Sequence, residues 1–448
     1  MRSLMFGAAL YGALCGAPAS AGGPVQEYTL DNGLKLIVQE DHRAHVAVVQ
    51  VWYRVGSAYE HDGITGVSHA LEHMMFKGTK RHGPGQFSTL VAANGGRHNA
   101  FTSTDYTAYY QEWSADKVPL SFELEADRMR NLVIDEAEFK KEINVVLEER
   151  RMRTDDAPQS LAVEAAQAVA FTTSPYRQPV IGWEADIKNM TAADLTAWYQ
   201  RWYAPNNAIV VVVGDVQPDA VLALARQHFG PLAKSDIPPP KPRPEVPQQG
   251  QRRVTLKSDK ARVPYLVMGY KAANLLAARA GASVEAWEPY ALDVLAATLS
   301  GDESSRLDKH LVRGQELAAE LSAGVDTGGL LPSLFFVNAV PADGVGLQKL
   351  EDAIVAELGA LEARPPTAAE LERIKTQVVA DNVFQRDSML HEAMTLGALE
   401  AVGLGWRVKD DYVARIQAVT AEQVLAVARK YLVPDQLTVA WLLPEQAP

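Results

Sequence analysis

Two histidines and a glutamate in one short stretch have the residue types and the spacing to hold a metal ion and to move a proton. The stretch is His69-Ala70-Leu71-Glu72-His73. On a helix, His69 and His73 stand at positions i and i+4 and project from one face, so both imidazoles can bind the same Zn²⁺. Glu72 lies beside them, where a carboxylate can take a proton from a water molecule at the metal. Two histidines do not complete a catalytic site, so the motif predicts a third ligand elsewhere in the chain.

The best candidates for that ligand are glutamates on a predicted helix over residues 138–150, for which Asp135 is a plausible N-cap. Glu142 and Glu149 are seven residues apart, almost two helical turns, so their carboxylates face the same way. One could bind the metal while the other supports it from behind. Spacing alone leaves Glu148 an equal candidate, and it leaves open that these are ordinary surface glutamates and that the histidines occupy a solvated helix face.

The segments around the motif alternate between strand and helix patterns. Strands are predicted within 27–60, where Asp31-Asn32-Gly33 signals a hairpin turn, and over 99–110 and 208–213. Helices are predicted within 119–153, over 192–202 and over 367–401. The expected class is α+β, with a mostly antiparallel sheet packed against helices.

The chain is expected to contain two related domains. A run of prolines at 236–251 predicts a semi-rigid linker between a metal-binding domain, 22–235, and a second domain, 252–448. Thr191, Leu195 and Trp202 recur at the same spacing as Thr420, Val424 and Tyr431. This repeat predicts a duplicated unit, and only the first copy carries the metal motif.

The chain resembles the pitrilysin and insulinase (M16) family of zinc peptidases, and in particular the zinc-bearing subunit of heterodimeric, two-domain members such as mitochondrial processing peptidase. The matching positions are H-x-x-E-H-M-x-F-K-G-T at 69–79, Gly95-Gly96, Asn99 to Ser103, Glu149 and Thr327-Gly328. The resemblance implies that His69, His73 and Glu149 bind one zinc ion per chain, that Glu72 is the catalytic base and that Glu142 supports the site. It also implies that the two domains form half of a clamshell.

The resemblance further implies a zinc-dependent endopeptidase that hydrolyses peptides or unfolded polypeptide segments. The strand carrying Asn99 and Ala100 is expected to pair with the substrate backbone. Phe76 and Phe101 are expected to line a side-chain pocket, with a simple core role as the equal alternative.

One departure from the family pattern concerns the C-terminal half. Single-chain members carry an Arg and a Tyr there, seven residues apart, which hold the substrate carbonyl. Val312 and Ala319 stand at these positions, and Arg313 is one residue off. The departure predicts a partner, a homologous subunit without zinc that supplies the Arg and Tyr.

Two other functions are alternatives to the peptidase. One is a non-catalytic scaffold or assembly subunit of the same fold, and the other is a peptide-binding module with structural zinc. The intact set of His69, Glu72, His73 and Glu149 disfavours the scaffold. Three ligands with a neighbouring Glu make an open site, which disfavours structural zinc.

Charge and the N-terminal segment bear on partners and location. The 448 residues have a net charge of −12, which argues against nucleic acid as a partner. Residues 1–21 read as a signal peptide, with an apolar run from Leu4 to Leu14 and cleavage near Ala21/Gly22. No later stretch is long and apolar enough to predict a membrane span. The expected location is therefore the periplasm, for a mature chain without its single cysteine, Cys15.

Overall fold

Runs of β-branched residues build a six-stranded sheet in the N-terminal half. The computed structural model describes residues 22–238, 243–281 and 283–445, so the predicted signal peptide, Cys15 and part of the predicted linker lie outside the described residues. The strands follow the order β1-β2-β6-β3-β5-β4, with only the β2–β6 pair parallel. They are β1 (Val25–Thr29), β2 (Lys35–Glu40), β3 (Val46–Tyr53), β4 (Arg97–Thr102), β5 (Thr107–Ser114) and β6 (Ala208–Gly214). The whole of β6 is buried, as expected for a strand with both sheet faces covered.

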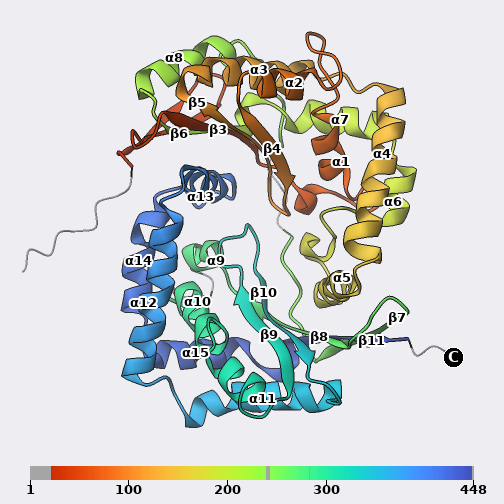
Figure 1. Cartoon of the computed structure of the whole chain (residues 1–448), viewed down its shortest axis with the longest axis vertical. Helices are drawn as coiled ribbons and strands as arrows, with labels where there is room; N and C mark the ends of the chain where they lie inside the picture. Colours follow the sequence, from red (N-terminus) through yellow and green to blue (C-terminus); the bar gives the residue numbers. More distant parts are fainter. Residues whose placement is uncertain (1–21, 239–242, 282, 446–448) are drawn as a thin grey trace, which may run out of the picture.

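Helices cover one face of this sheet and extend beyond its β4 edge (Figure 1). They form the larger N-terminal core with β3, β5 and β6. The helices of this half are α1 (Val67–Met74), α2 (Gln86–Ala93), α3 (Val118–Asn131), α4 (Glu136–Arg150), α5 (Pro158–Ala170), α6 (Glu184–Asn189), α7 (Ala192–Trp202) and α8 (Pro218–His228). A π-helical turn, Arg151–Asp155, continues α4.

The second sheet repeats the topology of the first. Its order is β7-β11-β8-β10-β9, with β7–β11 the parallel pair, which matches β2-β6-β3-β5-β4 strand for strand. The strands are β7 (Arg252–Ser258), β8 (Tyr265–Ala272), β9 (Ala318–Val325), β10 (Ser333–Pro341) and β11 (Leu437–Pro444). The helices are α9 (Leu275–Ala280), α10 (Glu288–Leu299), α11 (Leu347–Ala363), α12 (Ala368–Gln385), α13 (Met389–Ala401), α14 (Val408–Ala418) and α15 (Ala421–Tyr431).

The sequence repeat marks equivalent elements of the two copies. Thr191 and Thr420 both open a capping box, at the start of α7 and of α15. Each helix leads into the strand of the parallel pair that also pairs with the next strand inward, β6 beside β3 or β11 beside β8. The predicted α+β class, with two related units on mostly antiparallel sheets packed by helices, is confirmed.

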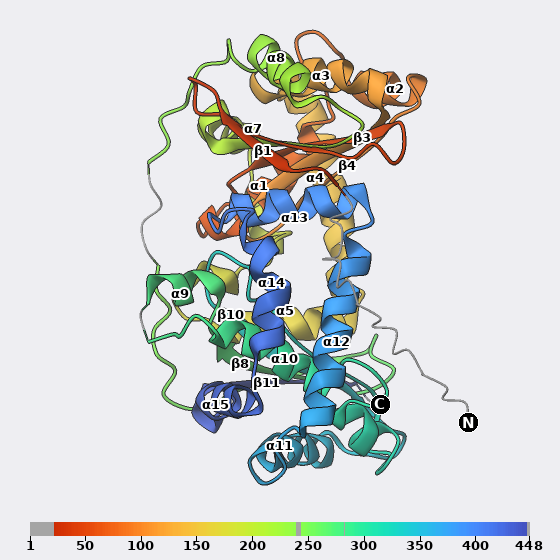
Figure 2. The same cartoon turned by 90° about the vertical axis from the view of Figure 1, so that its left-hand side faces the viewer.

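Each unit lends one helix to the other (Figures 1 and 2). Helix α5 packs against β7, β8 and β11 of the second sheet, and α13 packs against β3 and β6 of the first. The contact of α13 is close, because a Cβ on Gly397 would come within 2.1 Å of Cε2 of Trp52. The exchange fixes the second unit against the one that carries the metal motif.

The prediction of one continuous helix over 367–401 is wrong. The structure ends α12 at Gln385 and begins α13 at Met389, where the Ser388 side chain accepts a hydrogen bond from the His391 backbone N–H. The polar run from Gln385 to Ser388 interrupts the apolar positions there, and Ser388 is an N-cap residue type, a signal that the prediction passed over. Among the residues that the structure describes, no helix combines the length and the hydropathy that crossing a membrane requires.

Candidate metal centre

A buried glutamate fixes the helix that carries the histidines. Gly66 precedes α1 with φ = +87°, and a Cβ there would lie 2.4 Å from the carbonyl oxygen of Ile181. Glu60 accepts hydrogen bonds from the backbone N–H groups of Gly66 and Ser68, at 2.7 and 2.9 Å. These bonds satisfy N–H groups at the start of the helix that would otherwise have no partner. Burial raises the pKa of Glu60 to about 7.

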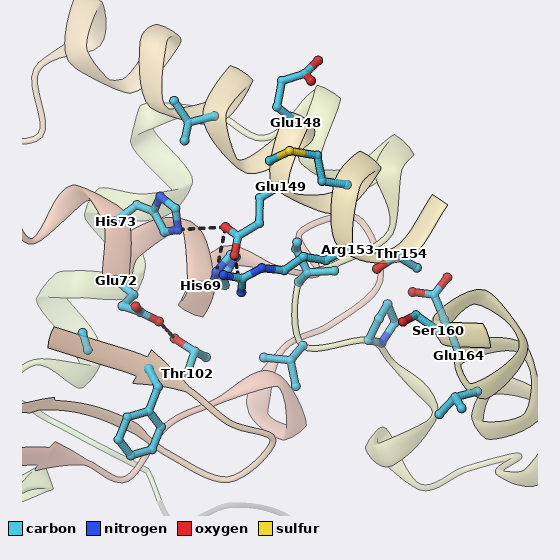
Figure 3. A pocket seen from close by; sticks show the side chains of 18 of the residues that line it. His69, Glu72, His73, Thr102, Glu148, Glu149, Arg153, Thr154, Ser160 and Glu164 are labelled. Atoms are coloured by element: carbon cyan, nitrogen blue, oxygen red, sulfur yellow. Dashed lines mark hydrogen bonds and ion pairs between the residues drawn. The ribbon is translucent and has the colours of Figure 1, made fainter. Parts of the chain in front are cut away.

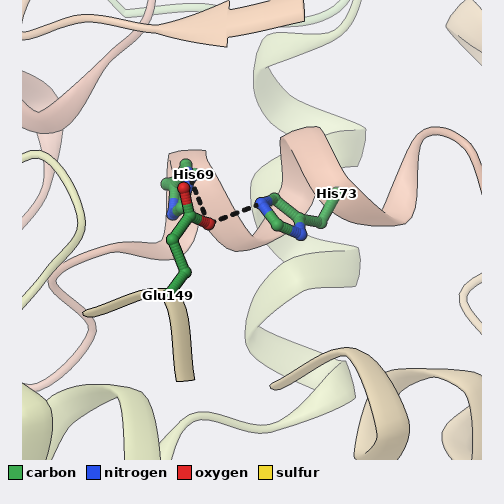
Figure 4. A group of neighbouring side chains, drawn as sticks. All are labelled: His69, His73 and Glu149. Atoms are coloured by element: carbon green, nitrogen blue, oxygen red, sulfur yellow. Dashed lines mark ion pairs between the residues drawn. The ribbon is translucent and has the colours of Figure 1, made fainter. Parts of the chain in front are cut away.

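Helix α4 brings the third donor to α1. The Asp135 side chain caps α4 by accepting from the backbone N–H groups of Ala137 and Glu138, as the sequence predicted. Glu149 then places Oε2 3.2 Å from Nε2 of His73 and 3.5 Å from Nε2 of His69 (Figure 4). One ligand atom from each of the three residues lies within 4.8 Å of the other two. Glu148, equal on spacing, is exposed and contacts Arg151 instead.

Glu142 stands behind His73. The Nδ1–H of His73 donates to Oε1 of Glu142 at 2.8 Å, and Nζ of Lys77 lies 2.5 Å from Oε2. This bond assigns the proton to Nδ1 and leaves the Nε2 lone pair facing Glu149, as in the carboxylate–histidine pairs that orient metal ligands. Burial would lower the pKa of His73, but the carboxylates of Glu142 and Glu149 outweigh it and raise that pKa. Burial would raise the pKa of Glu142, but His73 and Lys77 outweigh it and lower that pKa.

His69 has the electronic state that a metal ligand needs. Burial, with His73 and Arg153 nearby, lowers the pKa of His69 to about 3, so its imidazole is neutral near pH 7. Its Nδ1 is buried without a hydrogen-bond partner among the described residues. Two imidazole nitrogens and one carboxylate oxygen form a donor set typical of catalytic zinc sites. The residues present therefore fit zinc.

Glu72 lies beside this triad and contacts the edge of the sheet. Thr102, the last residue of β4, donates its hydroxyl to Oε2 of Glu72 at 2.6 Å (Figure 3). Burial raises the pKa of Glu72. Thr102 belongs to a stretch that the sequence singled out, but its contact with Glu72 depends on how β4 and α1 pack and was not predicted. The hydrogen bonds from the Gly66 and Ser68 backbone N–H groups to Glu60 were not predicted either, since they too depend on how the chain packs.

The triad and Glu72 open into a cavity of about 1120 Å³. The cavity is bounded by α1, by β4 and by the corner between α4 and α5. Strand β4 ends the strand order and pairs with β5 alone among the described strands, so its outer edge is free. Asn99 and Ala100 line the cavity on this strand, and the Ala100 N–H donates to Oδ1 of Asn99 at 2.9 Å.

The two phenylalanines lie in different surroundings. Phe101 lines the cavity and packs edge-on against Trp52, with ring centroids 5.5 Å apart. Phe76 is not among the lining residues described. Its ring stacks on His98, with centroids 5.3 Å apart, and lies 5.2 Å from the guanidinium of Arg128. Phe76 therefore packs against the N-terminal core, the alternative role expected for it.

The C-terminal positions that break the family pattern contribute no donor to the cavity. Val312 packs on the second core, and Ala319 is an exposed residue of β9. Arg313 lies 3.4 Å from Glu303, outside the cavity lining. No tyrosine lines the cavity within the described part of the chain.

The chain carries one H-x-x-E-H motif, the inverted form of H-E-x-x-H, in the first of two units with the same topology. Residues 35–183 match the family described as Insulinase (Peptidase family M16), and residues 189–378 match a domain described as Peptidase M16 inactive domain. The chain belongs to the M16 family.

Named relatives cover almost the whole chain. "Zinc protease PqqE" of Helicobacter pylori is 32% identical over 424 residues, which is 94% of this chain and 93% of that protein. The crystal structure of a protease from Helicobacter pylori, also 32% identical, has a TM-score of 0.88 and covers 94% of this chain and 100% of its own. "Mitochondrial-processing peptidase subunit beta" of Lentinula edodes is 26% identical over 423 residues, which is 92% of this chain and 88% of that protein.

Proposed function

We propose that this chain is a zinc-dependent endopeptidase that hydrolyses peptides or unfolded polypeptide segments. One observation carries the proposal: the donor atoms of His69, His73 and Glu149 converge beside Glu72, in a cavity bounded by a free strand edge. The name "Zinc protease" of the Helicobacter pylori relative supports the same activity.

The residues of the site have separate roles in metal binding and in proton transfer. His69, His73 and Glu149 would hold the zinc ion, with His73 oriented by Glu142. When bound, zinc supplies a Lewis acid that lowers the pKa of water and polarises a carbonyl group. Glu72 takes a proton from the attacking water and passes it to the leaving amine. The bond from Thr102 fixes one carboxylate oxygen of Glu72, which leaves the other free for this transfer.

Strand β4 would hold the substrate backbone. A free edge offers unpaired N–H and C=O groups to an extended peptide, which then continues the sheet. The Ala100 N–H is bonded to the Asn99 side chain rather than to β5, so that side chain must move aside when a peptide pairs there. This mode of binding reads the backbone and explains a preference for unfolded segments.

The substitution Glu72→Gln tests the activity. The variant should keep its zinc, because Glu72 is not part of the triad, and should lose nearly all turnover of a fluorogenic unstructured peptide. Glu136→Gln makes the same change of charge on an exposed residue of α4 outside the cavity and should leave both properties unchanged. Cleavage by Glu72→Gln at the wild-type rate contradicts the mechanism.

We also propose that the chain works with a homologous subunit that lacks zinc and supplies an Arg and a Tyr. The two arginines of the cavity are already engaged, Arg153 with Glu149 at 2.6 Å and Arg177 with Asp62 at 2.9 Å. The relative named as a subunit of a processing peptidase supports such a pairing. The purified chain should therefore hydrolyse peptides poorly, and full activity as a monomer or homodimer would refute the pairing.

We also propose that the chain is exported to the periplasm. The apolar run from Leu4 to Leu14, typical of a signal peptide, supports this location. N-terminal sequencing of the chain from a periplasmic extract should begin near Gly22. An uncleaved chain confined to the cytosolic fraction would contradict it.

A further inference from the structure

The connection between β9 and β10 contains a part of the family pattern that has no role in the metal centre. Its loop spans residues 326–331 and includes Thr327-Gly328. Buried contacts fix this loop within the second unit. The Leu275 N–H donates to the Thr327 carbonyl at 2.9 Å, and the fully buried Asn274 side chain donates to the Gly329 carbonyl at 2.6 Å. The position of the loop is therefore set by the second unit.

Two backbone N–H groups of this loop bind side chains of the first unit. The Leu330 N–H donates to Oδ2 of Asp105 at 2.8 Å, and the Leu331 N–H donates to the hydroxyl oxygen of Tyr176 at 3.0 Å. The Tyr176 hydroxyl in turn donates to Asp105, with its oxygen 2.8 and 2.7 Å from the two carboxylate oxygens. Burial raises the pKa of Asp105 to about 6, so its carboxyl is ionised near pH 7. Asp105 and Tyr176 are both buried, so a lost partner would leave a polar group unsatisfied.

Asp105 lies in the turn that joins β4 to β5, three residues after Thr102. The turn is closely enclosed, because a Cβ on Gly56 would come within 2.3 Å of the Ser103 carbonyl oxygen. Thr102 ends β4 immediately before this turn and donates its hydroxyl to Glu72 at 2.6 Å (Figure 3). Since only two residues separate Asp105 from Thr102, a displacement of the Asp105 side chain reaches the hydroxyl that fixes Glu72.

We propose that Asp105 is a positioning residue through which the second unit fixes Thr102, and thereby the carboxylate of Glu72. The inference rests on the proposed role of Glu72 as the base, and it adds the residues that hold this base in place. It gives a part in the reaction to the second unit, which lacks the H-x-x-E-H motif. Hydrogen bonds to an ionised carboxylate suit this role, because they are about twice as strong as those between neutral groups.

Hydrogen exchange of the full-length chain tests the contact between the units without relying on turnover. Gly329→Ala places a Cβ 2.9 Å from the Tyr176 hydroxyl oxygen and 3.4 Å from Oδ2 of Asp105. It should therefore speed exchange about threefold or more in the peptide that covers β4 and the following turn. Gly328→Ala is the matched control, because its Cβ would have one neighbour within 4 Å, at 3.6 Å, inside the same loop. Exchange that is unchanged in Gly329→Ala, or equally fast in both variants, overturns the proposal.

A double-mutant cycle tests whether Asp105 acts through Thr102. Asp105→Ala and Thr102→Val should each lower kcat about tenfold, as expected when a hydrogen bond to a charged group is lost. The double variant should be no slower than the slower single variant, because both changes release the same oxygen of Glu72. Zinc affinity should stay that of the wild type, since neither residue belongs to the triad. Losses that multiply, or a weakened zinc affinity in Asp105→Ala, overturn the assignment.

The two experiments separate this inference from the proposed function. If the wild-type chain hydrolyses no peptide but Gly329→Ala speeds exchange at β4 as predicted, the positioning contact is supported and the peptidase is not. If the wild-type chain is active and neither the exchange nor kcat responds, the positioning role is refuted and the peptidase stands. Tyr176→Phe, which removes a single hydroxyl group, takes the place of Asp105→Ala if that variant does not fold, and the same pattern is expected.

Discussion

Replacing Glu142 tests whether the triad is held for a metal. Glu142→Gln keeps the shape of the side chain but removes the charge that faces Nδ1 of His73 at 2.8 Å and Nζ of Lys77 at 2.5 Å. Its side chain is only 10% exposed, so solvent screens these contacts weakly. Loss of such an outer-shell carboxylate typically weakens metal binding about 10- to 100-fold. That corresponds to about 1.4–2.7 kcal/mol of binding free energy.

Zinc affinity is measured by competition with a chromophoric chelator of known affinity. Glu148→Gln is the control, because Glu148 lies on the same helix and carries the same charge, yet it faces Arg151. Its zinc affinity should stay close to that of the wild type. If both variants weaken zinc equally, or if Glu142→Gln binds like the wild type, the assignment of Glu142 as the group that orients His73 is refuted.

Two further predictions concern the start of α1. Gly66→Ala should lower the free energy of unfolding by about 2–4 kcal/mol, because it combines a left-handed φ with a clash against the Ile181 carbonyl. The control Gly63→Ala has φ = +100° and no atom within 4 Å of its Cβ, so it should lower that free energy by only about 1 kcal/mol. Equal losses in denaturant unfolding would refute the close approach. Because the pKa of folded Glu60 is raised from 4.5 to about 7, its protonated form stabilises the fold fully below pH 4.5, and this contribution, about 3 kcal/mol, is lost as the pH rises to about 7. Glu60→Gln should flatten that part of the stability–pH curve, and an unchanged slope would contradict the shift.

The sequence was most informative where a feature depends on local chemistry. Asp135 caps α4, and α7 has the predicted bounds Ala192–Trp202, since caps and amphipathic periods act within one or two turns. The prediction that His69 and His73 share a face depended only on the formation of α1. The prediction that Glu142 and Glu149 share a face depended only on the formation of α4.

Features that depend on packing between distant segments could not be predicted. Spacing did not separate Glu149 from Glu148, because the choice depends on how α4 packs against α1. The hydrogen bond from Thr102 to Glu72 forms at the end of β4. The hydrogen bonds by which Glu60 caps α1 form at the turn that contains Gly66. The exchange of α5 and α13 depends on contacts between segments far apart in the chain, which no local pattern encodes.

Peptide hydrolysis during zinc titration tests the central claim most directly. The full-length chain, in complex with any partner that co-purifies from its native cells, is stripped of metal and titrated with zinc in the presence of an unstructured fluorogenic peptide. Product formation should appear with zinc, saturate at about one equivalent per chain and be absent in Glu72→Gln. Turnover by the metal-free complex, or a zinc-saturated wild-type complex no faster than Glu72→Gln, would contradict the account, and the second result would favour the scaffold.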